Sequence, residues 1–456
     1  MKRYALLASL LIAVVVLPGS AGTGLKLPPV KTARLDNGAR LFFIQDELPQ
    51  VTIIVSAGFG KMYENRGNAG IADLMAQAVS LGGSKRYPGN ALHEKVDAMG
   101  GRLSIDASWE HMIVSLKVLD RFREEALDIV ADLVANPNFD EKYLDTAKAL
   151  VADSIRRKFD DPAEIAFDRA RAIIFGGAGY GSSPTEAGVR SYSLETVRET
   201  WAKHFTGRNM MIGMYAQFPF GEAERLCRAR FSAVPAGAPV EYPADRKKAL
   251  EVVASSRNRI YFYPKDIPQS TVVVGTVAPN IGEPGTYPLE VMNYILGGGS
   301  FSSRLMSDIR VKRGLAYAVQ SILRCRYRSG VFLAYAQTEN RNAGQVVSLM
   351  TGNIDRMAKE AVPAGEIAWA QKAISNSYVF QFDTPLNIMA YYMDIEYNRL
   401  PPDYSDLYLS RINAVTGADI MRESRDLFSP GLVTVVVGSE SVVPDLKKMG
   451  DVVRIQ

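Results

Sequence analysis

Few residues in this chain could hold a metal ion. The sequence contains three histidines, His93, His111 and His204, and no two of them have the spacing of a metal-binding pair. The two cysteines, Cys227 and Cys325, are too few for a cysteine-rich zinc cluster. They lie in different halves of the chain and could pair in an oxidising compartment, although their spacing does not require it.

A second group of residues could take part in catalysis or binding. Arg310 and Tyr317 stand at the two ends of the segment RVKRGLAY. Taken alone, each has an ordinary structural explanation. Arg310 could be a solvated charge on a helix that also carries Asp308, Lys312 and Arg313, and Tyr317 could be an aromatic residue of a β-sheet core.

A glycine-rich loop precedes this pair. Its residues Gly298, Gly299 and Ser300 lack the GxxxxGK[ST] pattern of a phosphate-binding loop, and no dinucleotide signature follows a strand here. Two interpretations remain open. The loop could line a cavity and admit an extended peptide, or it could be a plain loop beside a helix.

The elements that must position these residues are predicted from hydrophobic periodicity. In the first half, the pattern predicts strands rich in Ile, Val and Phe, a helix whose apolar residues recur at helical spacing, and consecutive amphipathic helices. The predicted strands are residues 40–45, 51–57, 102–108, 112–119 and 209–215, and the predicted helices are 71–81, 121–172 and 194–205.

The second half repeats this order of elements. Strands are predicted at 260–264, 271–276, 316–323, 330–337 and 432–438, with a helix at 289–296 and further helices from residue 343. The repeat is one of pattern and not of matching letters. It predicts an α+β fold made of two α/β-sandwich domains, each an antiparallel-rich sheet with helices on one face.

The domain boundaries follow from composition. Residues 233–248 are rich in Pro, Ala and charge, which is typical of a linker. We therefore predict one domain over residues 30–232 and another over 249–456.

Composition excludes several classes of protein. Hydrophobic residues make up 47% of the chain and charged residues 22%, so an intrinsically disordered protein is excluded. The formal net charge is +4, and no basic patch stands out, which argues against a nucleic-acid-binding protein.

The N-terminus has the pattern of a secretory signal peptide. Lys2 and Arg3 precede the apolar run ALLASLLIAVVVL, and small residues follow. The run is short for a membrane span, although an uncleaved anchor remains an alternative. We predict a signal peptide at residues 1–21 and an exported, periplasmic location.

Two segments resemble the insulinase, pitrilysin and mitochondrial processing peptidase family of zinc peptidases, the inverzincins. Residues 35–79 resemble the strand pair, the loop with Gly58 and Glu64, and the helix that opens the family's fold. Residues 296–321 resemble its glycine-rich loop with the Arg and Tyr that follow. The resemblance covers most of residues 30–440 and implies two homologous domains that enclose a cavity.

The zinc motif of this family is degenerate here. Active members carry HxxEH on the first helix, where two His bind zinc and Glu activates water. Asp73 and Gln77 stand at the His positions and Ala76 at the Glu position. The family's third ligand would fall near residues 152–154, where only Asp153 is acidic. No metal site is therefore expected in this chain.

The resemblance implies a role for the second group of residues. Arg310 and Tyr317 match the family's Arg–Tyr pair, which lies across the cavity from the zinc and stabilises the oxyanion formed during peptide hydrolysis. It also implies that Gly298, Gly299 and Ser300 contact substrate.

Three hypotheses follow from this combination. The first is the zinc-free subunit of a heterodimeric peptidase, in which an HxxEH partner holds the zinc and this chain supplies Arg310 and Tyr317. The second is a catalytically inactive peptide-binding or scaffold protein of the cell envelope. The third, a self-sufficient metallopeptidase that uses Asp73, is the least favoured.

Overall fold

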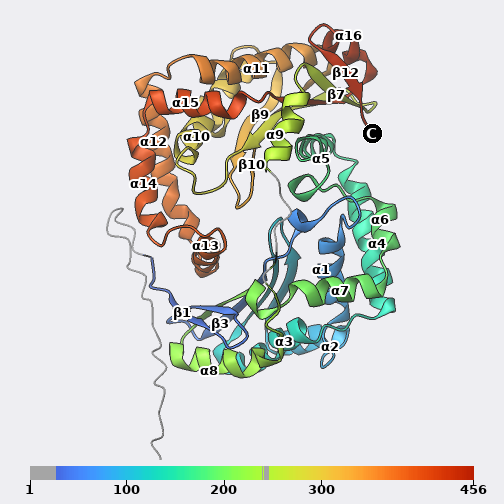
Figure 1. Cartoon of the computed structure of the whole chain (residues 1–456), viewed down its shortest axis with the longest axis vertical. Helices are drawn as coiled ribbons and strands as arrows, with labels where there is room; N and C mark the ends of the chain where they lie inside the picture. The colour runs from blue at the N-terminus through green and yellow to red at the C-terminus, as the bar shows by residue number, and fades with distance from the viewer. Residues whose placement is uncertain (1–26, 239, 241–245) are drawn as a thin grey trace, which may run out of the picture.

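The computed structural model describes residues 27–238, 240 and 246–456 (Figure 1). The predicted signal peptide, residues 1–21, lies outside this range, as does part of the predicted linker. Within the described residues the chain forms two six-stranded sheets, one in each half.

The first sheet is mixed, with most neighbours antiparallel. Its strand order is β1-β2-β6-β3-β5-β4, and the only parallel pair among its described neighbours is β2 with β6. The strands are β1 (Lys31–Arg34), β2 (Arg40–Gln45), β3 (Gln50–Ala57), β4 (Arg102–Ala107), β5 (Met112–Leu119) and β6 (Met210–Ala216).

The second sheet repeats five of these six positions. Its order is β12-β7-β11-β8-β10-β9, so β7 to β11 take the places of β2 to β6. The outer strand differs, because β12 comes from the C-terminus and pairs in parallel with β7. The strands are β7 (Arg259–Pro264), β8 (Gln269–Ala278), β9 (Ala316–Arg324), β10 (Gly330–Glu339), β11 (Val433–Gly438) and β12 (Asp451–Arg454).

Helices cover both sheets (Figure 1). In the first half they are α1 (Ile71–Gly82), α2 (Asn90–Ala98), α3 (Arg123–Ala135), α4 (Glu141–Lys158), α5 (Pro162–Ile174), α6 (Glu186–Ser191), α7 (Leu194–His204) and α8 (Phe220–Arg230). In the second half they are α9 (Arg246–Ser255), α10 (Thr286–Asn293), α11 (Ala343–Lys359), α12 (Ala364–Tyr378), α13 (Pro385–Tyr397), α14 (Tyr404–Ala414), α15 (Gly417–Phe428) and α16 (Val443–Leu446).

These elements confirm the predicted α+β fold of two homologous domains. The sequence analysis did not predict α2, α8 or the outer strands β1 and β12. Helix α9 begins at Arg246, inside the range assigned to the linker.

The central strands are buried on both faces. Every residue of β11, VTVVVG, is buried, and so is nearly every residue of β8. A strand with only one covered face would alternate apolar and polar residues. The sequence of these strands therefore requires a layer of apolar side chains on each side of the sheet.

A helix from the other half of the chain contributes to the second layer on each sheet, and α9 of the second half joins α5 on the second sheet. Helix α5 belongs to the first half by sequence, but Ile165, Ala170 and Ile174 pack with Val273 and Val435 of the second sheet. Figure 1 shows α5 beneath that sheet.

Helix α13 makes the reciprocal contact. Its residues Ile388, Met389 and Met393 pack on Phe42 and Met211 of the first sheet. The two halves thus exchange one helix each.

Local sequence sets where both exchanged helices begin. Asp161 accepts a hydrogen bond from the Ala163 backbone N–H, and Pro162 occupies the first turn of α5. Thr384 caps α13 in the same way, with Pro385 next to it. A capping side chain followed by Pro is a strong helix start, because Pro has no N–H to leave unsatisfied.

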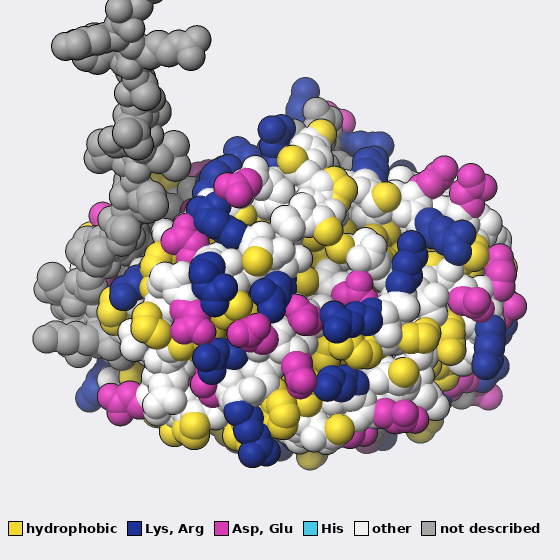
Figure 2. Space-filling model, turned by 90° about the horizontal axis from the view of Figure 1, so that it is seen from below, with side chains coloured by type: hydrophobic (Ala, Val, Ile, Leu, Met, Phe, Trp, Pro, Cys, Tyr) yellow, Lys and Arg dark blue, Asp and Glu magenta, His cyan; other side chains and the backbone are white. Residues whose placement is uncertain are grey.

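The outer surface of the first domain carries charges of both signs. Figure 2 shows Lys and Arg interspersed with Asp and Glu, with no continuous basic or acidic face in this view. Both cysteines are free thiols, and burial raises the pKa of each to about 12. No helix in the described ranges has the length and apolar character needed to cross a membrane.

Removing a buried side chain from the exchanged helix α5 should destabilise the whole chain. Ile174 is fully buried between α5 and the second sheet. We expect Ile174→Ala to lower the free energy of unfolding by about 2–4 kcal/mol, as measured by urea denaturation. Leu150→Ala, on an α4 residue that is 45% exposed, is the matched control and should cost under about 0.5 kcal/mol. Equal effects of the two substitutions would contradict the exchange as a source of stability.

Candidate functional site

Helix α1, which carries Asp73, Ala76 and Gln77, is held at its N-terminus by a buried glutamate. Its N-cap residue, Gly70, has a φ of 87° and no side chain to cap the helix. Instead, Oε1 of Glu64 accepts a hydrogen bond from the Ala72 backbone N–H at 3.0 Å, and Oε2 accepts one from Ser182 Oγ at 2.8 Å. Glu64 therefore supplies the cap from outside the helix.

The environment of Glu64 favours its neutral form. The side chain is 1% exposed, and burial raises its pKa to about 7, although the hydrogen bonds from Gly70, Ala72 and Ser182 oppose the shift. Glu64 was noted in the sequence as part of the loop before the helix, and the structure gives it this capping role.

The three motif positions on α1 do not fit a zinc ion. Oδ2 of Asp73 lies 3.0 Å from Lys61 Nζ, so this carboxylate already has a cation. Ala76 is buried and has no donor atom, and Gln77 offers only an amide. In the described part of the chain, no three His, Cys, Asp or Glu side chains gather as a metal site.

The candidate third ligand is also engaged elsewhere. Asp153 lies on α4, which packs against α1, and its carboxylate pairs with Arg156 and with Arg157, the latter at 2.7 Å. Two guanidinium groups on one carboxylate compete directly with a metal cation.

The three histidines have structural partners. His93 Nε2 lies 2.9 Å from the Ser80 carbonyl oxygen, and His111 Nδ1 lies 3.0 Å from Ser56 Oγ. The ring of His204 packs 4.2 Å from that of Phe59. Burial lowers the pKa of both His111 and His204 to about 4.

The glycine-rich loop packs closely against its neighbours. A Cβ on Gly299 would lie 2.4 Å from Trp369 Cη2 of α12, so only glycine fits there. Ser300 has a φ of 57°, an uncommon conformation for a residue with a side chain. Gly298 and Ser300 are exposed, whereas Gly299 is buried.

Gly298 lines a cavity of about 440 Å³ that is rich in tyrosine. Tyr408 donates a 2.5 Å hydrogen bond to Glu290 within it, and burial raises the pKa of Glu290 to about 7. Three substrate-contact residues were predicted on this loop, and of these only Gly298 lies on the cavity.

Arg310 lies in a π-helical turn, Met306–Val311, that follows the loop. Such turns are rare and occur often at functional sites. Within the described residues, no carboxylate lies within ion-pair distance of Arg310, whereas Asp308 on the same turn binds Arg313. The Arg310 guanidinium is therefore free for a ligand.

A β-bulge turns Tyr317 outward. In the pairing of β9 with β10, Ala316 faces Thr338 and Ala318 faces Gln337, so Tyr317 has no partner in the register. The extra residue in β9 re-aims its side chain, as bulges do near active sites. Tyr317 is 76% exposed as a result, which excludes a role as a core aromatic.

The structure brings Arg310 and Tyr317 together. The guanidinium carbon of Arg310 lies 5.1 Å from the centre of the Tyr317 ring and 5.1 Å from that of Phe301. Phe301 follows Ser300 in the glycine-rich loop and is 62% exposed. The sequence analysis missed it, although an aromatic residue directly after a glycine-rich run was a visible signal.

This cluster can donate hydrogen bonds to an anionic oxygen. A guanidinium has five N–H donors and a phenol has one O–H donor. Because the rings hold the guanidinium in place without a carboxylate, its charge remains available to a ligand. The degenerate positions of α1 lie in the other half of the chain and supply no second catalytic group.

The fold defines a class of protein, that of chains with two homologous α+β domains, each built on a six-stranded mixed sheet.

The chain belongs to the insulinase family, peptidase family M16. Residues 42–186 match the family model described as "Insulinase (Peptidase family M16)", and residues 191–374 match "Peptidase M16 inactive domain".

The curated relatives include proteins named as zinc proteases and a subunit of a respiratory complex. An uncharacterized zinc protease of Rickettsia bellii is 24% identical over 90% of this chain and 98% of its own length. Subunit 1 of the bovine mitochondrial cytochrome b-c1 complex is 22% identical over 78% of this chain and 75% of its own length.

Solved structures share the fold. A peptidase M16 inactive domain from Pseudomonas fluorescens superimposes with a TM-score of 0.80 at 21% identity, covering 90% of this chain and 98% of that one. A protease from Helicobacter pylori gives a TM-score of 0.80 at 16% identity, covering 90% of this chain and all of that one.

Replacing Glu64 by Gln should change the pH dependence of stability. Because folding raises the Glu64 pKa from 4.5 to about 7, its stabilising contribution is complete below pH 4.5 and is lost as the pH rises through 7. Glutamine does not titrate, so the wild type should lose about 1–3 kcal/mol relative to Glu64→Gln between pH 4.5 and 7.5.

Urea unfolding at pH 5 and pH 8 measures this difference. Glu94→Gln, at an exposed position of α2, is the control and should show no change in relative stability with pH. Parallel profiles for the wild type and Glu64→Gln would contradict the buried, neutral carboxyl group.

Proposed function

We propose that this chain is the zinc-free subunit of a heterodimeric exported metallopeptidase that degrades peptides. The single observation that carries the proposal is the cluster of Arg310, Tyr317 and Phe301, which is exposed and has no anionic partner among the described residues. A relic of a lost active site would have no need for a guanidinium and a phenol held side by side.

In this proposal the catalytic groups are divided between two chains. A homologous partner with an intact HxxEH motif would hold the zinc ion, which supplies a Lewis acid and an activated water molecule. This chain would contribute the hydrogen-bond donors Arg310 and Tyr317, because its own first helix lacks zinc ligands.

The task of Arg310 and Tyr317 is to stabilise developing charge. When water attacks a peptide carbonyl, the oxygen becomes an oxyanion. Hydrogen bonds from a guanidinium and a phenol strengthen as this charge grows, so they lower the barrier more than they favour substrate binding. The neighbouring glycine-rich loop, with Gly298, Gly299 and Ser300, would border the bound peptide.

Export is part of the proposal. The N-terminal residues 1–21 have the charge, apolar run and small residues of a signal peptide, and a periplasmic location follows if the source is a Gram-negative bacterium.

A second candidate is a catalytically inactive peptide-binding or scaffold protein of the cell envelope. The relative named as a cytochrome b-c1 complex subunit favours it, because that protein is named for the complex in which it assembles. The loss of all three motif residues on α1 agrees equally with both candidates.

A pull-down should separate the two candidates. The tagged mature chain, isolated from its native envelope fraction, should co-purify with a homologous chain that carries HxxEH and contains the zinc. The eluate should cleave an unfolded peptide, and a chelator should abolish the cleavage. A stable eluate without that partner and without cleavage would contradict the peptidase proposal and favour the scaffold.

Substitutions in the Arg310–Tyr317 cluster should then lower the activity of the reconstituted heterodimer. We expect Arg310→Ala to lower kcat about 10²-fold with little change in KM, because an oxyanion donor acts mainly in the transition state. Tyr317→Phe should lower kcat in the same way, since it removes only the hydroxyl group.

Lys312→Ala is the matched control for loss of a positive charge on the same segment. Lys312 is exposed and lies beside the π-helical turn, and its removal should leave kcat within about twofold of the wild type. Unchanged activity after Arg310→Ala and Tyr317→Phe would remove the catalytic role of the pair.

A further inference from the structure

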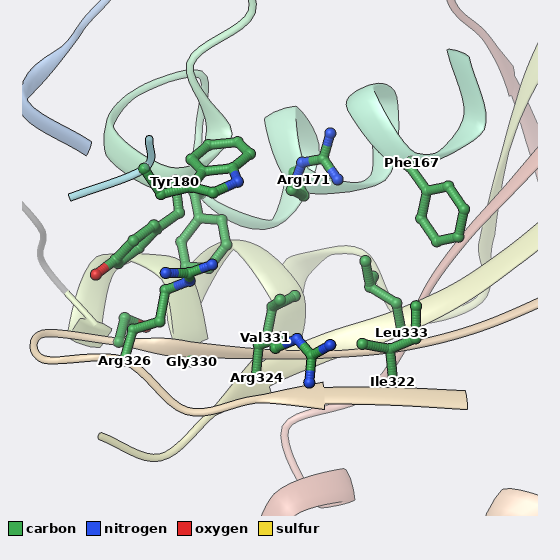
Figure 3. Close-up of a pocket in the computed structure, with 12 residues that line it drawn as sticks. Phe167, Arg171, Tyr180, Ile322, Arg324, Arg326, Gly330, Val331 and Leu333 are labelled. Carbon is green, nitrogen blue, oxygen red and sulfur yellow. The ribbon is translucent and has the colours of Figure 1, made fainter. Parts of the chain in front are cut away.

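A separate cavity lies where the exchanged helix α5 meets the second sheet. Its volume is about 250 Å³, close to the lower end of the range for small-ligand sites, about 300–1,000 Å³. Figure 3 shows Arg171 and Phe167 reaching into it from α5, opposite Arg324 and Arg326 on the side of β9 and β10.

The walls of this cavity are mostly apolar. Aromatic side chains line the side of the first domain, and aliphatic side chains line the sheet. The lining residues of these two kinds are Trp109, Phe167, Phe175, Tyr180, Ile322, Val331 and Leu333.

Three arginines also line the cavity, and one carboxylate neutralises one of them. Arg326 NH1 lies 3.3 Å from Oε2 of Glu110, whose other oxygen accepts a 2.5 Å hydrogen bond from Tyr180. In the described residues, neither Arg171 nor Arg324 has a carboxylate within ion-pair distance. Two guanidinium groups therefore border the cavity without an anionic partner among the described residues, Arg171 from a half-buried position and Arg324 from an exposed one.

Arg171 carries the larger share of the argument, because its side chain is half-buried whereas that of Arg324 is exposed. Its guanidinium carbon lies 5.1 Å from the ring centre of Trp109. Burial is the main cause that lowers its pKa, Asp168 and Glu164 oppose the shift, and Arg326 adds to it. Asp168 is itself bound by Lys158 and by Ser183 Oγ at 2.6 Å, so it does not pair directly with Arg171.

An unsatisfied hydroxyl provides an independent observation. Ser329 lines the same cavity and is 1% exposed, and its Oγ has no hydrogen-bond partner within the described part of the chain. A buried hydroxyl without a partner is costly, and a ligand in the cavity can supply one if the Ser329 side chain rotates toward it, because the Oγ itself has almost no exposed surface.

We propose that this cavity binds a carboxylate carried on an apolar group, with Arg171 and Arg324 as its cationic contacts. Guanidinium groups match the geometry of a carboxylate, and the apolar walls accept an aromatic or aliphatic body. A peptide with a free C-terminus and a large apolar last residue has this chemistry, and so does a free aliphatic acid.

The inference that the bound carboxylate belongs to a peptide rests on the proposed function, whereas the inference of a carboxylate site does not. A subsite for a peptide C-terminus would favour short peptides over internal segments of folded proteins, because only a free end carries the carboxylate that the two arginines would bind.

Binding to the mature chain alone tests the site without a partner subunit. Trp109 lines the cavity and is one of three tryptophans, so its fluorescence should report binding, and Trp109→Phe should remove the signal. Calorimetry should give the affinity in parallel. The probes are N-acetyl-Ala-Ala-Phe with a free carboxylate, the same peptide as its C-terminal amide, octanoate and octanamide.

We expect each acid to bind at least tenfold more tightly than its amide. Arg171→Met should remove this preference, Arg171→Lys should retain part of it, and Arg121→Met, at an exposed site outside the cavity, should leave it unchanged. If Arg171→Met fails to fold, as judged by circular dichroism, Arg324→Met on the exposed side of β9 gives the same test.

The outcomes are distinct. Preferential binding of the peptide acid supports the site and names a peptide terminus as its ligand. Preferential binding of octanoate supports the site with a free acid as its ligand, and leaves the proposed peptidase function to its own experiment. Equal binding of acids and amides, no binding of either acid, or a preference that survives both arginine substitutions would overturn the proposal.

Discussion

The structure depends on the need to cover both faces of each sheet. Strands such as β11, in which every residue is buried, cannot leave one face in water without exposing a row of valines. One face of each sheet is covered by helices of its own half, and α13 or α5 from the opposite half packs on the other face, where α9 joins α5. The exchange makes the two halves mutually dependent, and burial of Ile174 and Met389 at these contacts holds them together.

The same exchange forms one of the two features that suggest function. The cavity with Arg171 and Arg324 exists because α5 of one half lies on the sheet of the other. The Arg–Tyr cluster lies near the opposite end of β9, an edge strand whose bulge exposes Tyr317. One strand thus lies beside both the Arg310–Tyr317–Phe301 cluster and the cavity with Arg171 and Arg324, and none of these three arginines has a carboxylate within ion-pair distance among the described residues.

The two homologous halves have diverged in what they retain. In the first half, Glu64 still caps α1 at 3.0 Å, so the helix is preserved although its motif positions hold an ion pair, a methyl group and an amide. Fold stability and metal chemistry are therefore separable in this helix, since its apolar face and its cap do not involve the ligand positions.

In the second half, the glycine-rich loop and the π-helical turn retain an unusual geometry around Arg310. Such geometry is difficult to explain by stability alone.

The strands and helices with strong periodicity, the two-fold repeat and the family could be predicted from the amino-acid sequence alone. The pattern of residues 40–45 and 112–119 gave the boundaries of β2 and β5, because alternation and β-branched residues are local properties. The glycine-rich segment and the residues at 73, 76 and 77 were likewise readable, since motif spacing is preserved along the chain. Short amphipathic elements such as α2 and the outer strand β12 were missed, because their periodicity is weak.

The partners of each side chain depend on the tertiary structure. The exchange of α5 and α13 and the arginines beside Ser329 join residues distant in the sequence. The capping of α1 by Glu64 and the contact of Phe301 with Arg310 join nearer residues, and they depend on how the chain between these residues folds. Sequence spacing cannot encode such contacts, because burial and charge pairing depend on which surfaces meet after the sheets are covered.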